Sequence, residues 1–185
     1  MIVFLESKDI ILTPVSKDDV TSNQYRSWIN DQNSDVHTQH ALFPHTNEKI
    51  LSYYEAKGRD DKSIWLAIKV KPDFTHVGNI DISSINWVNQ TGTYNILIGD
   101  TSFQGRGLGY QSSMLILNHA FNRLNLRRVQ LGVEEGNLAA ISLYTKLGFV
   151  KEGILRSAVQ KNQLGVNVVL MSILKEEFSF DSRIL

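Results

Sequence analysis

A six-residue loop, Gln104 to Gly109, holds three glycines around Arg106, between an apolar stretch and residues with helical spacing. Glycine lets a backbone come close to a ligand. The first amides of a helix have no partner inside it, and they lie at the positive end of the helix dipole. The loop is therefore typical of an anion-binding site, with phosphate as the expected ligand. A tight turn that only lets the helix pack closely is the alternative.

The sequence of this loop does not match two common phosphate-binding motifs. The dinucleotide fingerprint GxGxxG requires a glycine where Tyr110 stands, and the P-loop must end in Gly, Lys and then Ser or Thr. The sequence therefore does not support nucleotide triphosphate or dinucleotide chemistry at this loop.

A different pattern does match. Gln104, Gly107 and Gly109 form QxxGxG, which resembles the acyl-CoA pyrophosphate loop of the GNAT N-acetyltransferase superfamily. The segment GNLAAISLYTKLGF resembles a second element of that superfamily, in which an Asn opens a helix and a Tyr precedes LGF. The resemblance covers most of Thr91 to Leu174, and KLGFVKEGILR resembles the branch with ribosomal-protein alanine acetyltransferases and amino-sugar N-acetyltransferases.

The resemblance implies an α/β (α+β mixed) fold in one domain, residues 1–185. Its central, mostly antiparallel sheet would be flanked by helices and splayed at an acetyl-CoA cleft, between the strand ending near Ile98 and the strand of Val129 to Val133. The pyrophosphate would need little positive charge, because backbone amides would bind it. The cofactor-binding residues implied are Ile98, Gln104, Gly105, Arg106, Gly107, Leu108, Gly109, Asn137 and Ala140.

Asn137, Ala140, Ile141 and Tyr144 share one helix face, because they lie at i, i+3, i+4 and i+7. Seven steps along a helix span about 10.5 Å, which suits part of an extended thiol-bearing arm. The chemistry implied is direct attack of an amine on the thioester. The resemblance makes Tyr144 the acid that protonates the leaving thiolate, since a phenol of pKa about 10 stays protonated at neutral pH. A mere packing role for Tyr144 is the alternative.

The general base is not identified by the resemblance. One branch carries a Glu where this chain has Gly132. Glu134 and Glu135 lie just beyond, and either Asp81 or Asp100 is a candidate acting through water. Solvated carboxylates are the alternative for each.

The acceptor is expected to be a primary amine of low pKa. Holding an alkyl amine neutral at pH 7 costs about 4.6 kcal/mol, against about 1.4 for an α-amine near pKa 8. Amino sugars, including nucleotide-linked ones, and protein N-terminal α-amines both fit. YRSWIND resembles a segment of the amino-sugar branch, and the substrate residues predicted are Trp28, Asn30, Asp31 and Asp81, although the Trp equally suits the core.

Two function classes remain: the acetyl-CoA-dependent N-acetyltransferase, and a sensor or scaffold that binds acyl-CoA without transfer. A pure binder has no need of the phenol, which favours the enzyme. A metal site is not expected. His37, His40 and His45 lack a Glu in zinc-hydrolase spacing, and the chain has no cysteine.

The elements expected around these residues alternate along the chain. Strands are predicted over 9–15, 64–70, 76–88 with a bulge after Ser83, 93–100 and 127–133, with two more after Phe149 joined by a turn at 161–163. Helices are expected from the capping box at Ser16, after the glycine loop, and from Asn137 to Gly148. The segment 30–44 has no clear period. Antiparallel strands followed by a βαβ unit are thus predicted.

Composition excludes several classes. The 185 residues have 19 basic and 19 acidic side chains, so the formal charge of zero gives no broad footprint for nucleic acid. No apolar run reaches the roughly 20 residues that span a bilayer. We expect no membrane partner, a cytoplasmic location and a possible homodimer.

Overall fold

The computed structural model describes residues 1–31, 43–161 and 163–185. Its centre is an eight-stranded sheet in the order β1-β2-β3-β4-β5-β6-β8-β7. The strands are β1 (Leu5–Glu6), β2 (Ile10–Pro14), β3 (Ile64–Val70), β4 (Thr75–Asn86), β5 (Thr91–Ile98), β6 (Arg128–Glu134), β7 (Val150–Lys161) and β8 (Leu164–Leu174). The helices are α1 (Lys17–Thr21), α2 (Asn23–Asn30), α3 (Asn47–Gly58), α4 (Leu108–Asn122) and α5 (Leu138–Leu147), with short 3-10 turns at Thr101–Phe103 and Ser182–Ile184.

All neighbouring strands pair antiparallel except β5 and β6, which are parallel and are connected through α4. The predicted architecture is confirmed: a mostly antiparallel sheet with one βαβ unit. The expected bulge is present, since the β4–β5 register shifts between Ser83 and Asn86.

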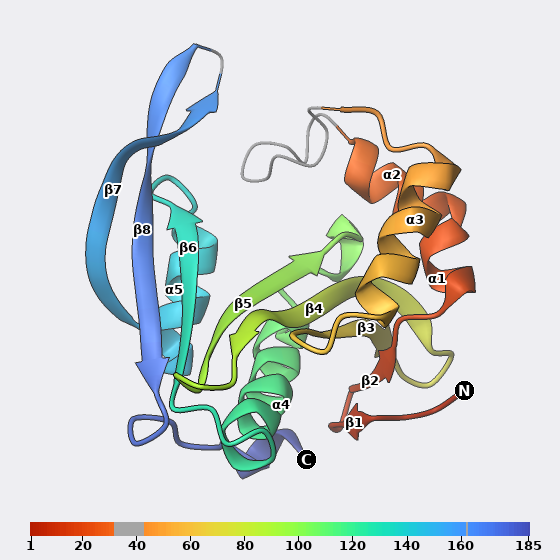
Figure 1. Cartoon of the computed structure of the whole chain (residues 1–185). Helices are drawn as coiled ribbons and strands as arrows, with labels where there is room; N and C mark the ends of the chain where they lie inside the picture. The colour runs from red at the N-terminus through yellow and green to blue at the C-terminus, as the bar shows by residue number, and fades with distance from the viewer. Residues whose placement is uncertain (32–42, 162) are drawn as a thin grey trace.

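The sheet is splayed in the middle. β5 and β6 pair only from Thr91 to Thr93 and then separate, which Figure 1 shows as two arrows diverging upward. This separation of the two strands, called the cleft below, lies where the resemblance implied the acetyl-CoA cleft.

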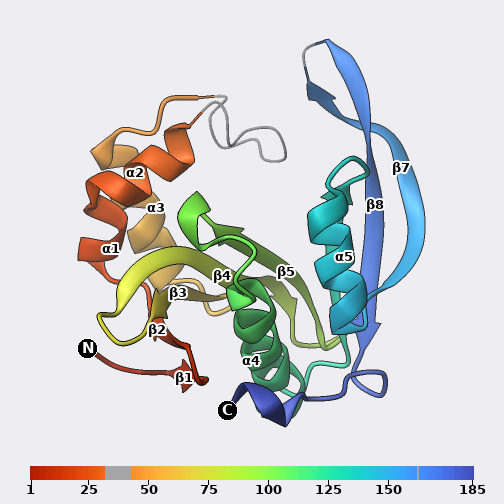
Figure 2. The ribbon, with the colours of Figure 1, turned by 180° about the vertical axis from the view of Figure 1, so that it is seen from behind.

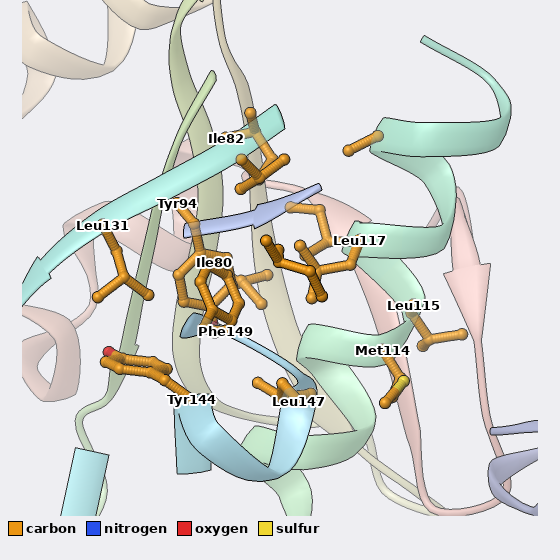
Figure 3. Packing of buried hydrophobic residues seen from close by; sticks show 14 of the residues in the cluster. Ile80, Ile82, Tyr94, Met114, Leu115, Leu117, Leu131, Tyr144, Leu147 and Phe149 are labelled. Carbon is orange, nitrogen blue, oxygen red and sulfur yellow. The ribbon is translucent and has the colours of Figure 1, made fainter. Parts of the chain in front are cut away.

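Helices cover the two faces of the sheet separately, as the opposite views of Figures 1 and 2 show. α4 and α5 cover one face, where the larger buried cluster lies; Figure 3 shows Tyr94, Leu117, Tyr144 and Phe149 packed within it. On the other side, α1 to α3 bury a second cluster that includes Trp28 and Ile50. Each face of the sheet thus has its own buried core. The separation of β5 and β6 lies between these two cores.

The N-terminal helices differ from the prediction. The capping box at Ser16 and Asp19 is confirmed, but the single helix expected there is two, since Ser22 ends α1 and caps α2 through its hydroxyl. A short polar side chain competes for backbone amides in this way, which favours a break. α3 was not predicted, because Ile50 is its single buried residue and its apolar period is weak.

Among the described residues, no helix is long and apolar enough to cross a bilayer.

Candidate active site

The glycine loop is held against the end of β5 by side-chain hydrogen bonds. Gln104 Nε2 donates to the carbonyl oxygen of Ile98 at 3.0 Å. Asp100 caps the turn at Thr101–Phe103 by accepting from the Ser102 amide at 3.0 Å. The loop therefore has a fixed position relative to the strand edge that opens into the cleft.

Two of its glycines adopt a conformation that other residues avoid. Gly105 has φ 73° and Gly107 has φ 79°, in the left-handed region where a Cβ is strained. Gly107 is the N-cap of α4, and the amide of Gln111 donates to its carbonyl at 3.1 Å. The amides of Leu108 to Tyr110 precede that bond, so they have no partner within the helix.

The other residues predicted at this loop have distinct roles. The Arg106 guanidinium lies 4.9 Å over the Phe103 ring. Leu108 is buried, whereas a Cβ on Gly109 would lie 3.4 Å from the Leu143 side chain, so α4 and α5 approach closely there. The fit to a phosphate is thus made by backbone amides beside one cation.

The open edge of β5 also presents polar backbone. The amide of Gly99 donates to Val77 on β4 at 3.0 Å. Successive residues of an antiparallel strand point their backbone N–H and C=O groups to opposite neighbours. The backbone groups of Ile98 and Ile96 therefore point away from β4, into the cleft. Apart from the Ile98 carbonyl, which accepts from Gln104, these groups can bind an amide-rich chain laid along the edge, as a strand would.

The helix on the other side of the cleft is α5. Asn137 caps it, as predicted: its Oδ1 accepts from the Ala140 amide at 3.1 Å. Gly148 ends the helix in the left-handed conformation. Asn137 and Ala140 are half-buried, and Tyr144, one turn further, is buried to 9% exposure.

Tyr144 lies in an aromatic cluster. Its ring meets that of Tyr94 edge-on, with centroids 5.8 Å apart, and that of Phe149 at 5.9 Å. In Figure 3 its oxygen points away from the aliphatic side chain of Leu147. Burial raises the pKa of the Tyr144 phenol to about 12. The phenol therefore stays protonated at every pH near neutral.

A cavity of about 580 Å³ lies on the opposite face of the sheet. Helices α2 and α3 form its upper wall, and β3 to β5 form its floor. It reaches Asn95, Ile96 and Leu97, in the stretch of β5 that no longer pairs with β6. A molecule bound in it therefore has access to the edge of the cleft.

Asp81 is the predicted substrate residue that lines this cavity. Its carboxylate lies 3.5 Å from Lys57 Nζ, and both side chains are 14% exposed. Burial raises the pKa of Asp81, while the Lys57 ammonium acts in the opposite direction. A buried carboxylate with one cation beside it is a candidate proton acceptor.

The other three predicted substrate residues lie around the cavity rather than in its lining. Trp28 is buried against Gly99, where a Cβ would come within 2.1 Å of the indole. Asn30 bridges two chain segments: its Oδ1 accepts from the His45 amide at 2.8 Å and its Nδ2 donates to the Arg26 carbonyl. Asp31 is exposed at the end of α2.

The remaining candidate bases have structural partners. Glu134 forms a 2.8 Å ion pair with Lys161, Glu135 accepts from Asn167, and Asp100 caps the turn beside the loop.

Sequence reasoning missed the contribution of α3. Lys49, Tyr53 and Lys57 line the cavity from this helix, and their spacing of i, i+4 and i+8 places them on one face. That polar and aromatic period was visible in the sequence. The described residues contain no group of three or more His, Asp or Glu side chains that could hold a metal; His37 and His40 lie outside the described residues, and His45 lines the cavity.

The sequence is similar to those of known acetyltransferases. Residues 9–150 match the family described as acetyltransferase (GNAT) domain. Spermidine N(1)-acetyltransferase of Escherichia coli is 31% identical over 109 residues, which are 59% of this chain and 58% of that enzyme's length. The probable N-acetyltransferase YjcK of Bacillus subtilis is 25% identical over 181 residues, covering 94% of this chain and 98% of its own.

Solved structures share the fold. Spermidine N-acetyltransferase from Vibrio cholerae, in a crystal structure with CoA and spermine, superposes with a TM-score of 0.82 at 22% identity, over 91% of this chain and 96% of that one. Since the match to the acetyltransferase (GNAT) domain spans most of the sequence and the splayed fold agrees with it, the chain belongs to the GNAT family of N-acetyltransferases.

Proposed function

We propose that the protein transfers the acetyl group of acetyl-CoA to a primary amine. One observation carries the proposal: the cavity on one face of the sheet reaches the unpaired stretch of β5, and the glycine loop follows the same strand. A thioester lying along that strand edge and an amine in the cavity would meet at the splay. A sensor of acyl-CoA would need the loop but not the adjoining cavity.

Acetyl-CoA fits the loop because its pyrophosphate needs amide donors more than charge. Gly105 and Gly107 carry no side chain over the free amides of the first turn of α4. Arg106 adds one cation, and Asn137 and Ala140 line the face of α5 that leads toward Tyr144. These residues, with Ile98, form the proposed CoA site.

The reaction needs no protein nucleophile. The amine nitrogen forms a bond to the thioester carbon, and the C–S bond then breaks to leave an amide and a thiolate. Tyr144 donates a hydrogen bond to the sulfur. With a pKa of about 12 against about 8.5 for a thiol, complete transfer from Tyr144 is uphill by about 5 kcal/mol. The phenol thus keeps its proton and acts mainly as a hydrogen-bond donor while charge develops on the sulfur, and CoA leaves as a thiolate that solvent can protonate.

Asp81 is the carboxylate that we propose to receive the amine proton, directly or through a water. It lines the cavity, whereas Glu134, Glu135 and Asp100 have the structural partners described above. Its pairing with Lys57 favours the ionised form that a base requires.

The proposed acceptors are amines of low pKa: amino sugars, free or nucleotide-linked, and protein N-terminal α-amines. Polyamines form a second candidate class, because the E. coli relative is a spermidine acetyltransferase. An alkyl amine would have to lose its proton at a cost of about 4.6 kcal/mol at pH 7, so this class depends more strongly on the base.

Acceptor-dependent release of CoA tests the function. We expect at least one amine in a panel of amino sugars, peptides and polyamines to raise thiol release well above acetyl-CoA hydrolysis. Tight acetyl-CoA binding, with no acceptor raising the rate, would instead support the sensor.

Self-association is part of the same proposal. β7 is the edge strand of the sheet and exposes Val150, Ile154 and Leu155, and exposed apolar edge strands favour pairing with another chain. Light scattering across a concentration series distinguishes a homodimer from a monomer.

A further inference from the structure

The acceptor cavity has an unbalanced charge. Among the described residues that line it, Lys49 and Lys57 carry positive charge and Asp81 carries negative charge. Lys57 is committed to Asp81 at 3.5 Å. The cation in excess is therefore Lys49, an exposed residue of α3 whose Nζ donates to the Pro44 carbonyl at 3.3 Å and has further N–H donors for a ligand.

The two cations stand at opposite ends of one helix face. Eight residues separate Lys49 from Lys57, so they lie about 12 Å apart along the helix axis. Tyr53 lies between them, with its ring 5.9 Å from Lys57 Nζ and in edge-on contact with Trp65 at 5.5 Å. The cavity thus has the Asp81–Lys57 ion pair at its floor, an aromatic middle and a basic end at the rim.

This order matches a molecule with an amine at one end and an anion at the other. We propose that the acceptor carries a phosphate or carboxylate several bonds from its amine, which Lys49 binds while the amine lies beside Asp81. The inference rests on the proposed transferase function and specifies its substrate class. A charge-assisted hydrogen bond to an oxyanion is among the stronger ones that a side chain can make.

The same arrangement opposes a polycation. A polyamine with one amine at Asp81 would bring its distal ammonium toward Lys49. Like charges at such distances repel, and they do so more strongly in a partly enclosed site than in water. The described part of the cavity therefore differs in charge from what a spermidine site needs.

Pairs of acceptors that differ only in the anion test the proposal. One pair is glucosamine and glucosamine 6-phosphate; the other is a dialanine peptide with a free carboxylate and its C-terminal amide. We expect kcat/KM to be at least about tenfold higher for the anionic member of one pair. The pair that shows the difference identifies phosphate or carboxylate as the group bound.

The Lys49→Gln variant should remove most of that preference by raising KM for the anionic acceptor, while KM for the neutral member stays the same. Lys17→Gln, which neutralises an exposed lysine on α1 away from the cavity, is the matched control and should change neither. Equal kcat/KM for the two acceptors of each pair would overturn the inference, and so would a preference for spermidine that Lys49→Gln leaves unchanged. Either result would still be compatible with the proposed transferase function.

If no acceptor supports transfer, the proposed function fails, and binding then tests the subsite alone. Calorimetry with glucosamine 6-phosphate in the presence of CoA should give heat that Lys49→Gln abolishes and Lys17→Gln retains. No difference between the two variants would overturn the subsite as well.

Discussion

The ring of Tyr144 meets the ring of Tyr94 edge-on, with centroids 5.8 Å apart, yet the two phenols have different surroundings. The hydroxyl of Tyr94 is fully buried and hydrogen-bonded to Ser113 Oγ at 2.6 Å. Within the described residues, Tyr144 has no such hydroxyl partner. One phenol thus completes the core, and its neighbour is available to a substrate.

The substitution Tyr144→Phe should therefore lower kcat by about 10²-fold or more, because it removes the hydrogen-bond donor that stabilises the leaving sulfur. The affinity for CoA, measured by calorimetry, should stay nearly unchanged. Tyr94→Phe is the control: it should cost about 1 kcal/mol of unfolding free energy by removing one hydrogen bond of Ser113 Oγ, which still donates to the Gly109 carbonyl at 2.6 Å. Equal losses of CoA affinity and turnover in Tyr144→Phe would contradict the donor role.

A side chain at Gly107 should damage the CoA site. The substitution Gly107→Val forces a β-branched residue to φ 79°, at a cost of about 1 to 2 kcal/mol, and adds a side chain to the proposed path of the pyrophosphate. We expect CoA binding to be lost in calorimetry. Gly58→Ala, at a site with open space and no positive φ, should leave binding intact; wild-type affinity in Gly107→Val would remove the loop from the binding site.

The hydrogen bond from Gln104 to Ile98 should determine how well the loop is preorganised. Gln104→Glu replaces the donor with a carboxylate that faces a carbonyl oxygen, so repulsion replaces attraction. We expect KM for acetyl-CoA to rise by about tenfold, equivalent to about 1.4 kcal/mol. Gln104→Ala should have a smaller effect, since it removes the bond without the repulsion. A larger effect of Ala than of Glu would argue against this account.

The pH profile of turnover should report Asp81. Activity is expected to fall as pH drops through the pKa of Asp81, because a protonated carboxyl cannot accept the amine proton. Since Lys57 opposes the raised pKa of Asp81, Lys57→Met should move this acid limb to higher pH, and Lys57→Arg should not. Asp81→Asn should lower kcat and flatten the limb; an unchanged limb in Asp81→Asn would assign the base elsewhere.

Stability should decrease in mild acid because of His76. Its Nε2 contacts two acceptors, the Gly78 carbonyl at 3.0 Å and Asn79 Oδ1 at 2.9 Å, and burial lowers the pKa of the imidazole. The unfolded chain then binds more protons than the folded one as pH falls below about 6.5, so the unfolding free energy falls with pH in that range.

Urea unfolding at pH 7.5, 6.0 and 5.0 measures this loss. The His76→Gln variant should lose less unfolding free energy over this pH range, because Gln does not titrate. It keeps a side-chain donor for the two acceptors. The lowered pKa of Asp19, whose carboxylate lies 2.8 Å from Lys69 Nζ, should add a second loss at more acidic pH. An identical pH dependence in His76→Gln would assign the effect to other groups.

Sequence alone determined the features that contiguous residues encode. The capping box at Ser16, the glycine loop, the Asn137 cap and the Gly148 terminator each depend on a few neighbouring side chains and amides, so their pattern can be read directly. The strands were predicted for a similar reason, because period-two alternation is local. α3 was missed since just one of its residues enters the core, and the break at Ser22 was missed because one serine serves both α1 and α2.

Tertiary structure alone decided which residues share the acceptor cavity. Asp81 is a stronger candidate base because it lines the cavity. Trp28 and Asn30 instead stabilise the chain segments around the cavity. Lys49 and Asp81 line the same cavity because of how α3 packs over the sheet, which the order of residues does not specify. Register and helix packing bring together side chains far apart in the chain, and the charge of the cavity is a property of that assembly.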